Sequence, residues 1–267
     1  MRRLAPVLAL VTVLGTALAA CGSSGPSGSS GSSPAASPAP HAGSACPDES
    51  KDAGRQVSFA DAKDGTVLRG ILMNPDGKGP GVVLGHHNTG SVCEWLPFGK
   101  TLAGKGYRVL AFDFAGEGDS QPHTGTGTVD LDMLTAARWL RTQGVTDLVL
   151  MGASKGGTAA LAAAQELDPR PKAVVTLSAP ATFRGVDALG AARKVTFPVL
   201  YCAGALDSPY GEQAQELYDA TPAAVDRRVV VGPTATEHGT YLLTGSDQDR
   251  FTKAIDDFLS KNAPPAA

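Results

Sequence analysis

The segment that most constrains this chain runs from residue 148 to residue 160 and reads LVLMGASKGGTAA. Its first four residues are apolar and predict a buried strand, whereas the alanine-rich stretch after Thr158 predicts a helix. Between them lies Gly152-Ala153-Ser154-Lys155-Gly156, a G-x-S-x-G pattern. A connection this tight leaves no room for a Cβ at either glycine. Unless the serine is incidental to a glycine-rich connection, the spacing places Ser154 between the carboxyl end of a strand and the N-terminus of a helix.

A serine in that position acts as a nucleophile when a base, and an acid that orients the base, lie beside it. The apolar run 197–204 predicts another buried strand, and Asp207 lies in the loop that follows it. The next predicted strand is followed by His238. Taken singly, such an aspartate is usually a turn residue and such a histidine a surface residue. Their order after Ser154, at one edge of a sheet, favours a catalytic triad with Asp207, rather than Glu237, as its acid.

With these residues the chain resembles the α/β-hydrolase superfamily, from about residue 55 to residue 262. Residues 64–70 look like the hairpin between the first two strands of that family. The sequence DFAGEGDS at 113–120 is similar to the family's D-x-x-G-x-G-x-S loop after the fourth strand. The resemblance implies an α/β fold with a mainly parallel, eight-stranded type of sheet and helices on both faces. Helices are expected at 94–105, 130–142, 158–167, 210–220 and 247–261.

The third predicted strand, 81–85, leads into His86-His87-Asn88-Thr89-Gly90, which is similar to the family's H-G-x-x-G loop. The resemblance implies that the backbone N–H groups of Asn88 and Lys155 form an oxyanion hole. His87 stands where the family usually has glycine. Neighbouring histidines on an extended backbone point to opposite sides, so no metal is expected here, and His86 is expected to pack beneath the site. The Lys155 side chain is expected to be solvated near the mouth.

The implied reaction is the hydrolysis of carboxylic esters through an acyl-enzyme, without a cofactor. Residues 181–196 leave little room for the helical cap of lipases, so the site is expected to be open and to take short-chain or soluble acyl esters. This resembles the dienelactone-hydrolase and small-esterase branch, whose usual nucleophile is cysteine. A serine peptidase or acyltransferase on the same triad, and a non-catalytic binding lipoprotein on this scaffold, stay open as alternatives.

The N-terminus predicts export. Arg2 and Arg3 precede an apolar stretch, and Leu18-Ala19-Ala20-Cys21 resembles the lipoprotein box of bacteria. We therefore expect a signal peptide over 1–20, a lipidated Cys21 with a Gly/Ser/Pro-rich tether to residue 45, a hydrolase domain over 46–262 and a disordered tail over 263–267. The expected location is the extracytoplasmic face of the bacterial cell membrane, anchored by lipid.

The net charge and the cysteines of the chain limit which partners and which location are expected. The 267-residue chain carries a net charge of −3, and loss of Arg2 and Arg3 makes it more acidic, which gives no support for nucleic-acid binding. A monomer acting on a small-molecule ester is expected. An oxidising location favours a disulfide. Three pairings of Cys46, Cys93 and Cys202 are open, and Cys46 with Cys93 is preferred because Cys202 lies in a predicted buried strand.

Overall fold

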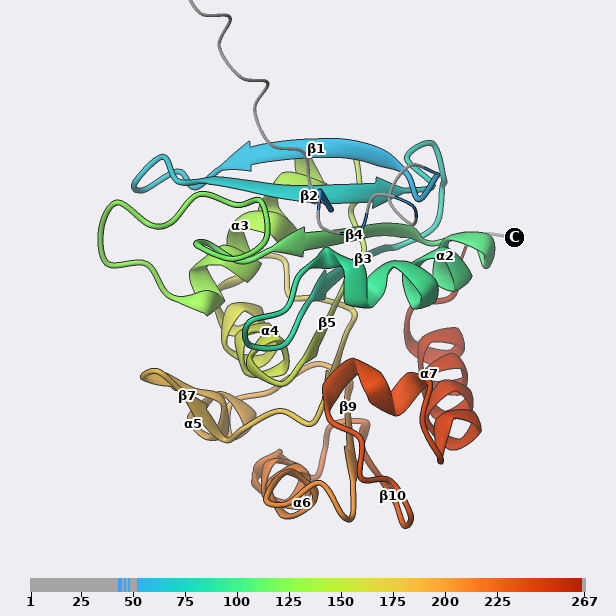
Figure 1. Ribbon diagram of the computed structural model, residues 1–267. Coiled ribbons are helices and arrows are strands. Elements are labelled where there is room, and N and C mark those ends of the chain that lie inside the picture. The colour runs from blue at the N-terminus through green and yellow to red at the C-terminus, as the bar shows by residue number, and fades with distance from the viewer. Residues whose placement is uncertain (1–42, 45, 47, 49–51, 266–267) are drawn as a thin grey trace, which may run out of the picture. The chain divides into compact units, whose positions relative to one another are not determined.

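The computed structural model describes residues 43–44, 46, 48 and 52–265. Over these residues the chain forms an eight-stranded sheet with helices packed on both faces (Figure 1). The expected signal peptide, Cys21 and most of the tether lie outside the described residues. In the described part of the chain, no helix has the length and apolar character needed to cross a membrane.

The strands follow the order β1-β2-β4-β3-β5-β6-β9-β10 across the sheet. β2 pairs antiparallel with β1 and with β4, and every later pairing is parallel. Parallel strands end at a common edge, so the loops after β3, β5, β9 and β10 all emerge on one side of the molecule. The strand bounds are β1 (Arg55–Ala60), β2 (Val67–Met73), β3 (Gly81–Gly85), β4 (Arg108–Asp113), β5 (Leu148–Ala153), β6 (Ala173–Leu177), β9 (Val199–Gly204) and β10 (Arg227–Gly232).

Two hydrophobic cores lie on opposite faces of this sheet. In β5, Leu148 and Leu150 pack into one core, and Val149 and Met151 into the other, because successive side chains alternate between faces. Helices α3, α4, α5 and α6 cover the first face, and α2 and α7 cover the second (Figure 1). Both faces are apolar, as a covered parallel sheet requires. The helix bounds are α2 (Leu96–Gly104), α3 (Val129–Thr142), α4 (Lys155–Glu166), α5 (Ala188–Ala192), α6 (Tyr210–Ala220) and α7 (Gln248–Asn262).

The predicted fold class is confirmed, and so are the bounds expected for α6. Two helix starts differ from expectation by more than one residue. The helix expected from residue 94 begins at Leu96, after the 3₁₀ turn η1 (Val92–Trp95), and α4 begins at Lys155 rather than at Thr158. At the C-terminus, Ala263 is buried against the second core, so the first residue assigned to the tail packs onto the fold.

The connection between β6 and β9 is short, as the sequence predicted. It consists of the two-stranded hairpin β7 (Thr182–Phe183) and β8 (Val186–Asp187), followed by the five-residue helix α5. The β7–β8 hairpin and α5 occupy the position at which a helical cap domain would be inserted. The carboxyl edge of the sheet therefore carries no sizeable cap in the described residues.

Candidate active site

Ser154 lies on a strained turn between β5 and α4. Its backbone has φ 51° and ψ −119°, a conformation that L-residues rarely adopt. A Cβ at Gly152 would overlap the carbonyl group of Gly156, and a Cβ at Gly156 would overlap the carbonyl oxygen of Gly85. The Ser154 amide donates a 2.7 Å hydrogen bond to the carbonyl of Leu177, at the end of β6. Both glycines of the motif are therefore required by close backbone contacts, as predicted.

Asp207 and His238 meet beyond the ends of two neighbouring strands. Asp207 follows β9 and His238 follows β10, and their Oδ2 and Nδ1 atoms lie 2.8 Å apart. A carboxylate only accepts hydrogen bonds, so Nδ1 carries the proton and Nε2 is left as a free acceptor in the neutral ring. Tyr210 packs against the same imidazole, with 4.3 Å between ring centroids. The pair has the geometry of a base oriented by an acid.

The loop that carries His238 returns to the turn that carries Ser154. Gly239, with φ +61°, is so close to β5 that a Cβ there would lie 3.3 Å from the Cβ of Ala153. Its amide donates a 3.1 Å hydrogen bond to Oγ of Ser178, which follows β6. The residue after His238 and the residue before Ser154 are thus in contact. The loop of His238 therefore lies against the turn of Ser154.

Glu237, the rival acid, is engaged elsewhere. Its carboxylate accepts hydrogen bonds from the amides of Ser246 (3.1 Å) and Thr236 (3.0 Å). The hydrogen bond from Glu237's own backbone amide, followed by those from Ser246 and Thr236, lowers the pKa of the carboxyl group. Glu237 fastens the loop after β10 to the start of α7 and leaves the imidazole to Asp207.

His86 fixes the loop that follows β3. It is fully buried; its Nδ1 lies 2.8 Å from the carbonyl oxygen of His87, and its Nε2 accepts a 3.1 Å hydrogen bond from the amide of Phe114. Gly90 also donates to the carbonyl of His87, over 3.1 Å. In a trans peptide the C=O and the following N–H point in opposite directions. The Asn88 N–H is therefore directed away from His86 and Gly90.

These contacts also settle the state of the His86 ring. Nε2 accepts, so Nδ1 carries the proton and the ring is neutral. Burial, helped by the nearby positive charge of Lys155, lowers the pKa of His86 to about 3. The prediction that His86 packs beneath the site and orders the loop agrees with these contacts. In the described residues, no group of three or more His, Cys, Asp or Glu side chains is arranged to hold a metal ion.

The Lys155 side chain is buried, so the expectation that it is solvated is wrong. Its ammonium group pairs with Glu117 and lies 4.6 Å above the ring of Phe114. Burial lowers the pKa of Lys155, although the hydrogen bond to Glu117 opposes that shift. A cavity of about 130 Å³ opens beside this pair, between the loop after β4 and the β7–β8 hairpin. The backbone N–H of Lys155, at the first position of α4, lies next to Ser154 on the helix N-terminus.

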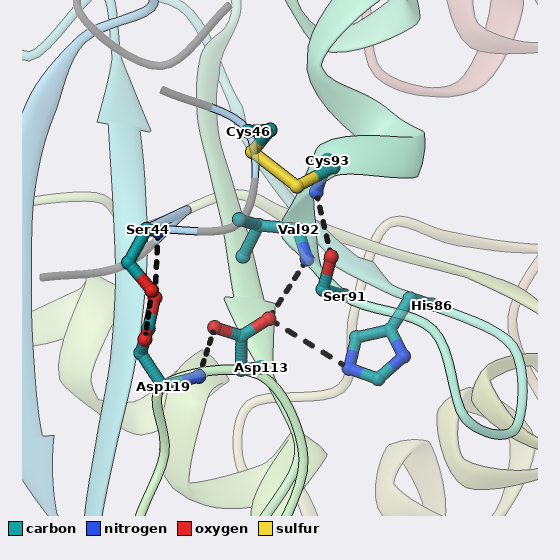
Figure 2. Close-up of a disulfide and its surroundings, with 8 residues drawn as sticks. All are labelled: Ser44, Cys46, His86, Ser91, Val92, Cys93, Asp113 and Asp119. Atoms are coloured by element: carbon teal, nitrogen blue, oxygen red, sulfur yellow. Dashed lines mark hydrogen bonds and ion pairs between the residues drawn. A yellow bond between two sulfur atoms is a disulfide. The ribbon is translucent and has the colours of Figure 1, made fainter. Parts of the chain in front are cut away.

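Asp113, which the resemblance marked only as part of a loop, is a buried anchor (Figure 2). Its carboxylate accepts hydrogen bonds from the amides of Val92 (2.8 Å) and Asp119 (3.0 Å). Burial raises the pKa of Asp113 to about 6, against the lowering effect of these two bonds. The acid thereby joins the loop after β3 to the loop after β4. The signal that could have found it is its place in the D-x-x-G-x-G-x-S sequence.

A disulfide joins Cys46 to Cys93, with 5.7 Å between the Cα atoms (Figure 2). Among the described cysteines, Cys202 is unpaired, buried in β9. Ser44, two residues before the bridge, donates its amide to the carboxylate of Asp119 over 2.8 Å. The start of the described chain is thus fastened beside the loops that surround His86.

A family model described as alpha/beta hydrolase fold matches residues 80–197, and no curated protein matches the chain. Esterase Pf2001 of Pyrococcus furiosus is 19% identical, with a TM-score of 0.66 over 78% of this chain and 91% of that one. A predicted CIB-like hydrolase from Thermoplasma acidophilum is 19% identical, with a TM-score of 0.62 over 78% and 98%. Esterase RhEst1 from Rhodococcus sp. ECU1013 is 16% identical, with a TM-score of 0.65 over 78% and 99%. At these identities the likenesses establish the fold.

Proposed function

On this α/β-hydrolase fold, we propose that the chain is a serine esterase that hydrolyses carboxylic esters. Ser154 is the nucleophile, His238 the general base and Asp207 the acid that orients it. The observation that carries the proposal is the 2.8 Å contact between Asp207 and His238, in a loop that touches the strained turn of Ser154. That several structures with the same fold are named esterases supports the same reaction class.

The reaction follows from the state of each group. Nε2 of His238 takes the Ser154 proton as Oγ attacks the ester carbonyl, and Asp207 stabilises the imidazolium that forms. The imidazolium then protonates the departing alcohol, which leaves an acyl group on Oγ. A water molecule gives a proton to Nε2 as it attacks this acyl group. Collapse of the second tetrahedral intermediate releases the carboxylic acid and returns the proton to Ser154.

The backbone N–H groups of Asn88 and Lys155 stabilise the negative oxygen in both intermediates. Each such donor contributes about 3–4 kcal/mol to lowering the barrier. The direction of the Asn88 N–H, away from the anchored carbonyl of His87, supports its role. The position of Lys155 at the start of α4 supports the second donor. The buried Lys155 side chain takes no part in this step, because Glu117 and Phe114 hold it.

We propose short-chain or soluble acyl esters as substrates and place the chain with the small, uncapped esterases. The short β7–β8 hairpin supports this choice, because lipids with long acyl chains need a longer apolar wall than it provides. Activity is expected to fall as the acyl chain of a p-nitrophenyl ester series is lengthened beyond about ten carbons.

Export as a lipoprotein is part of the same proposal and rests on the sequence around Cys21. The disulfide between Cys46 and Cys93 supports an oxidising compartment. Mass spectrometry of the N-terminal peptide from a bacterial host tests the proposal. We expect diacylglycerol on Cys21 in the parent. In Cys21→Ala we expect this lipid to be absent and the chain to be released from the membrane. An unmodified Cys21 in the parent would refute the proposed lipid anchor.

The reaction is tested with p-nitrophenyl acetate, purified protein and Ser154→Ala. We expect hydrolysis by the parent and background rates in the variant, with an unchanged circular dichroism spectrum. Ser58→Ala, an exposed serine on the edge strand β1, is the matched control and should keep full activity. A fluorophosphonate should label the parent at Ser154 and leave the variant unlabelled. Equal rates in parent and Ser154→Ala would refute the proposed nucleophile.

A further inference from the structure

His87 is held by a carboxylate that reaches back from the next turn of chain. Its Nδ1 lies 2.8 Å from Oε2 of Glu94, and its backbone N–H donates to the same oxygen over 3.5 Å. The ring nitrogen is close to the carboxylate without pointing straight at it. The other oxygen of Glu94 lies against Gly90, where a Cβ would overlap it. Glu94 thus contacts both ends of the segment from His87 to Gly90.

Glu94 is itself fixed from two directions. It lies in η1, whose first amide, that of Val92, donates to the buried carboxylate of Asp113 over 2.8 Å. Its neighbour Cys93 carries the disulfide to Cys46 (Figure 2). Because the backbone at Glu94 is already held, only the rotamers of its side chain are ordered when it contacts His87. Glu94 is therefore a firm anchor for the residue it touches.

The ring of His87 also reaches the loop of the proposed base. Its centroid lies 5.8 Å from that of Tyr241, in η2 (Gly239–Leu243). A Cβ at Gly239, the residue after His238, would lie 3.8 Å from the Cβ and Nδ1 of His87. A glycine at position 87 would keep only the backbone contact with Glu94 and would lose the ring contacts with Glu94 and Tyr241. The imidazole fills the space between the loop after β3 and the loop after β10.

We propose that His87, clamped by Glu94, is a positioning residue that fixes the Asn88 N–H relative to His238. The proposal rests on the proposed esterase function and deepens it. The peptide between His87 and Asn88 is anchored at its carbonyl by His86 and at its preceding side chain by Glu94. The loop after β3 and the loop after β10 then both contact the ring of His87. The His87 side chain thereby couples the oxyanion hole to the base.

A positioning role for His87 and Glu94 predicts a different measurable effect from a purely stabilising role. The His87 and Glu94 side chains are only 20% and 14% exposed, so truncating either one is also expected to lower the free energy of unfolding. A misplaced oxyanion donor weakens binding of the tetrahedral intermediate and leaves ground-state binding unchanged. The discriminating measurement is therefore the affinity for a trifluoromethyl ketone, whose adduct on Ser154 carries an oxyanion, beside kcat/KM for p-nitrophenyl acetate.

The variants are His87→Ala, Glu94→Ala and the double variant, with His87→Gln and Glu94→Gln as conservative changes. Each alanine variant should lower kcat/KM about tenfold and weaken binding of the trifluoromethyl ketone by the same factor. The double variant should lose no more activity or affinity than either single variant. The glutamine variants should recover part of the loss. Asp257→Asn removes the acid of the exposed Lys253–Asp257 pair on α7 and should leave both quantities unchanged.

The outcomes separate this proposal from the esterase assignment. Alanine variants with parent kcat/KM and parent ketone affinity, in a protein that Ser154→Ala inactivates, would overturn the role of His87 and leave the nucleophile standing. Activity that survives Ser154→Ala would overturn the esterase assignment itself. If His87→Ala does not fold, the glutamine variants decide between the outcomes. A loss of kcat/KM in Glu94→Gln that is matched by an equal loss of affinity for the trifluoromethyl ketone supports the proposal. Parent values of both quantities in both glutamine variants refute it.

Discussion

Gly156 packs directly on the carbonyl oxygen of Gly85, so the first turn of α4 touches the end of β3. This contact sets the distance between the turn of Ser154 and the loop that contains Asn88. No side chain can be accommodated there without moving one of two buried backbones. The spacing of the candidate site therefore depends on a residue that has no functional group.

Gly156→Ala is expected to lower the free energy of unfolding by about 1–3 kcal/mol, the usual cost of overpacking. Esterase activity should fall by about 100-fold, because a shift near 1 Å disturbs the alignment of reacting groups. Urea unfolding and p-nitrophenyl acetate hydrolysis measure the two effects. Gly104→Ala, at the end of α2 where an added Cβ meets open space, is the control: it should leave activity unchanged and should not lower the free energy of unfolding.

Asp207→Asn is expected to lower kcat by about 10⁴-fold, because the amide cannot hold the imidazole in the tautomer that accepts the Ser154 proton. Glu237→Gln removes a neighbouring acid that serves Ser246 and Thr236 and should leave kcat near that of the parent. Steady-state rates on one soluble ester compare the two. A larger loss in Glu237→Gln than in Asp207→Asn would exchange the roles of the two acids.

His86 gives the stability a defined pH dependence. Its pKa is near 6.5 in an unfolded chain and about 3 in the fold, so the unfolded state binds more protons between these values. The stabilising contribution of the neutral ring is complete above about pH 6.5. It falls by about 1.4 kcal/mol for each pH unit below that.

Asp113 acts in the opposite direction, because its pKa is raised to about 6 and protonation relieves the cost of burying its charge. The contribution of His86 is therefore measured as a difference. Urea unfolding of the parent and of His86→Asn, from pH 7 to pH 4.5, should show the parent losing its advantage as the pH falls. Parallel profiles across this range would mean that His86 is not buried in neutral form.

The disulfide is expected to contribute about 4 kcal/mol to the free energy of unfolding, for a bridge with a sequence separation of 47 residues. Cys46→Ser combined with Cys93→Ser should lose that amount in urea unfolding. Dithiothreitol should destabilise the parent equally and have no further effect on the double variant. Sensitivity of the double variant to dithiothreitol would point to another bridge.

The parts of this fold that depend on local sequence pattern are predictable from the sequence. The apolar runs of β5 and β9, the glycines around Ser154 and the order Ser154, Asp207, His238 are all visible without coordinates. The start of α4 was placed too late because Gly156 and Gly157 have low helix propensity, which tertiary contact overrides here. The β7–β8 hairpin, with two residues in each strand, is too short to show a period.

The missed features depend on partners that are distant in the sequence. Lys155 was expected in solvent because lysine usually lies there, but Glu117, 38 residues earlier, supplies the charge that allows its burial. The anchoring of His86 depends on the amide of Phe114, 28 residues away. The clamp by Glu94 is only seven residues from His87, but it needs the turn that η1 makes to bring the two together.

The bridge between Cys46 and Cys93 also determines where a mechanical load enters the fold. β1 is an outer strand of the sheet, and β1 and β2 both lie within the covalent ring that the bridge closes. A pull on the chain before residue 46 passes through the two sulfur atoms to η1 and bypasses this edge hairpin. Tension that would peel an edge strand from a sheet is delivered instead to the turn beside the buried Asp113. Reduction of the bridge would reroute the same force to β1.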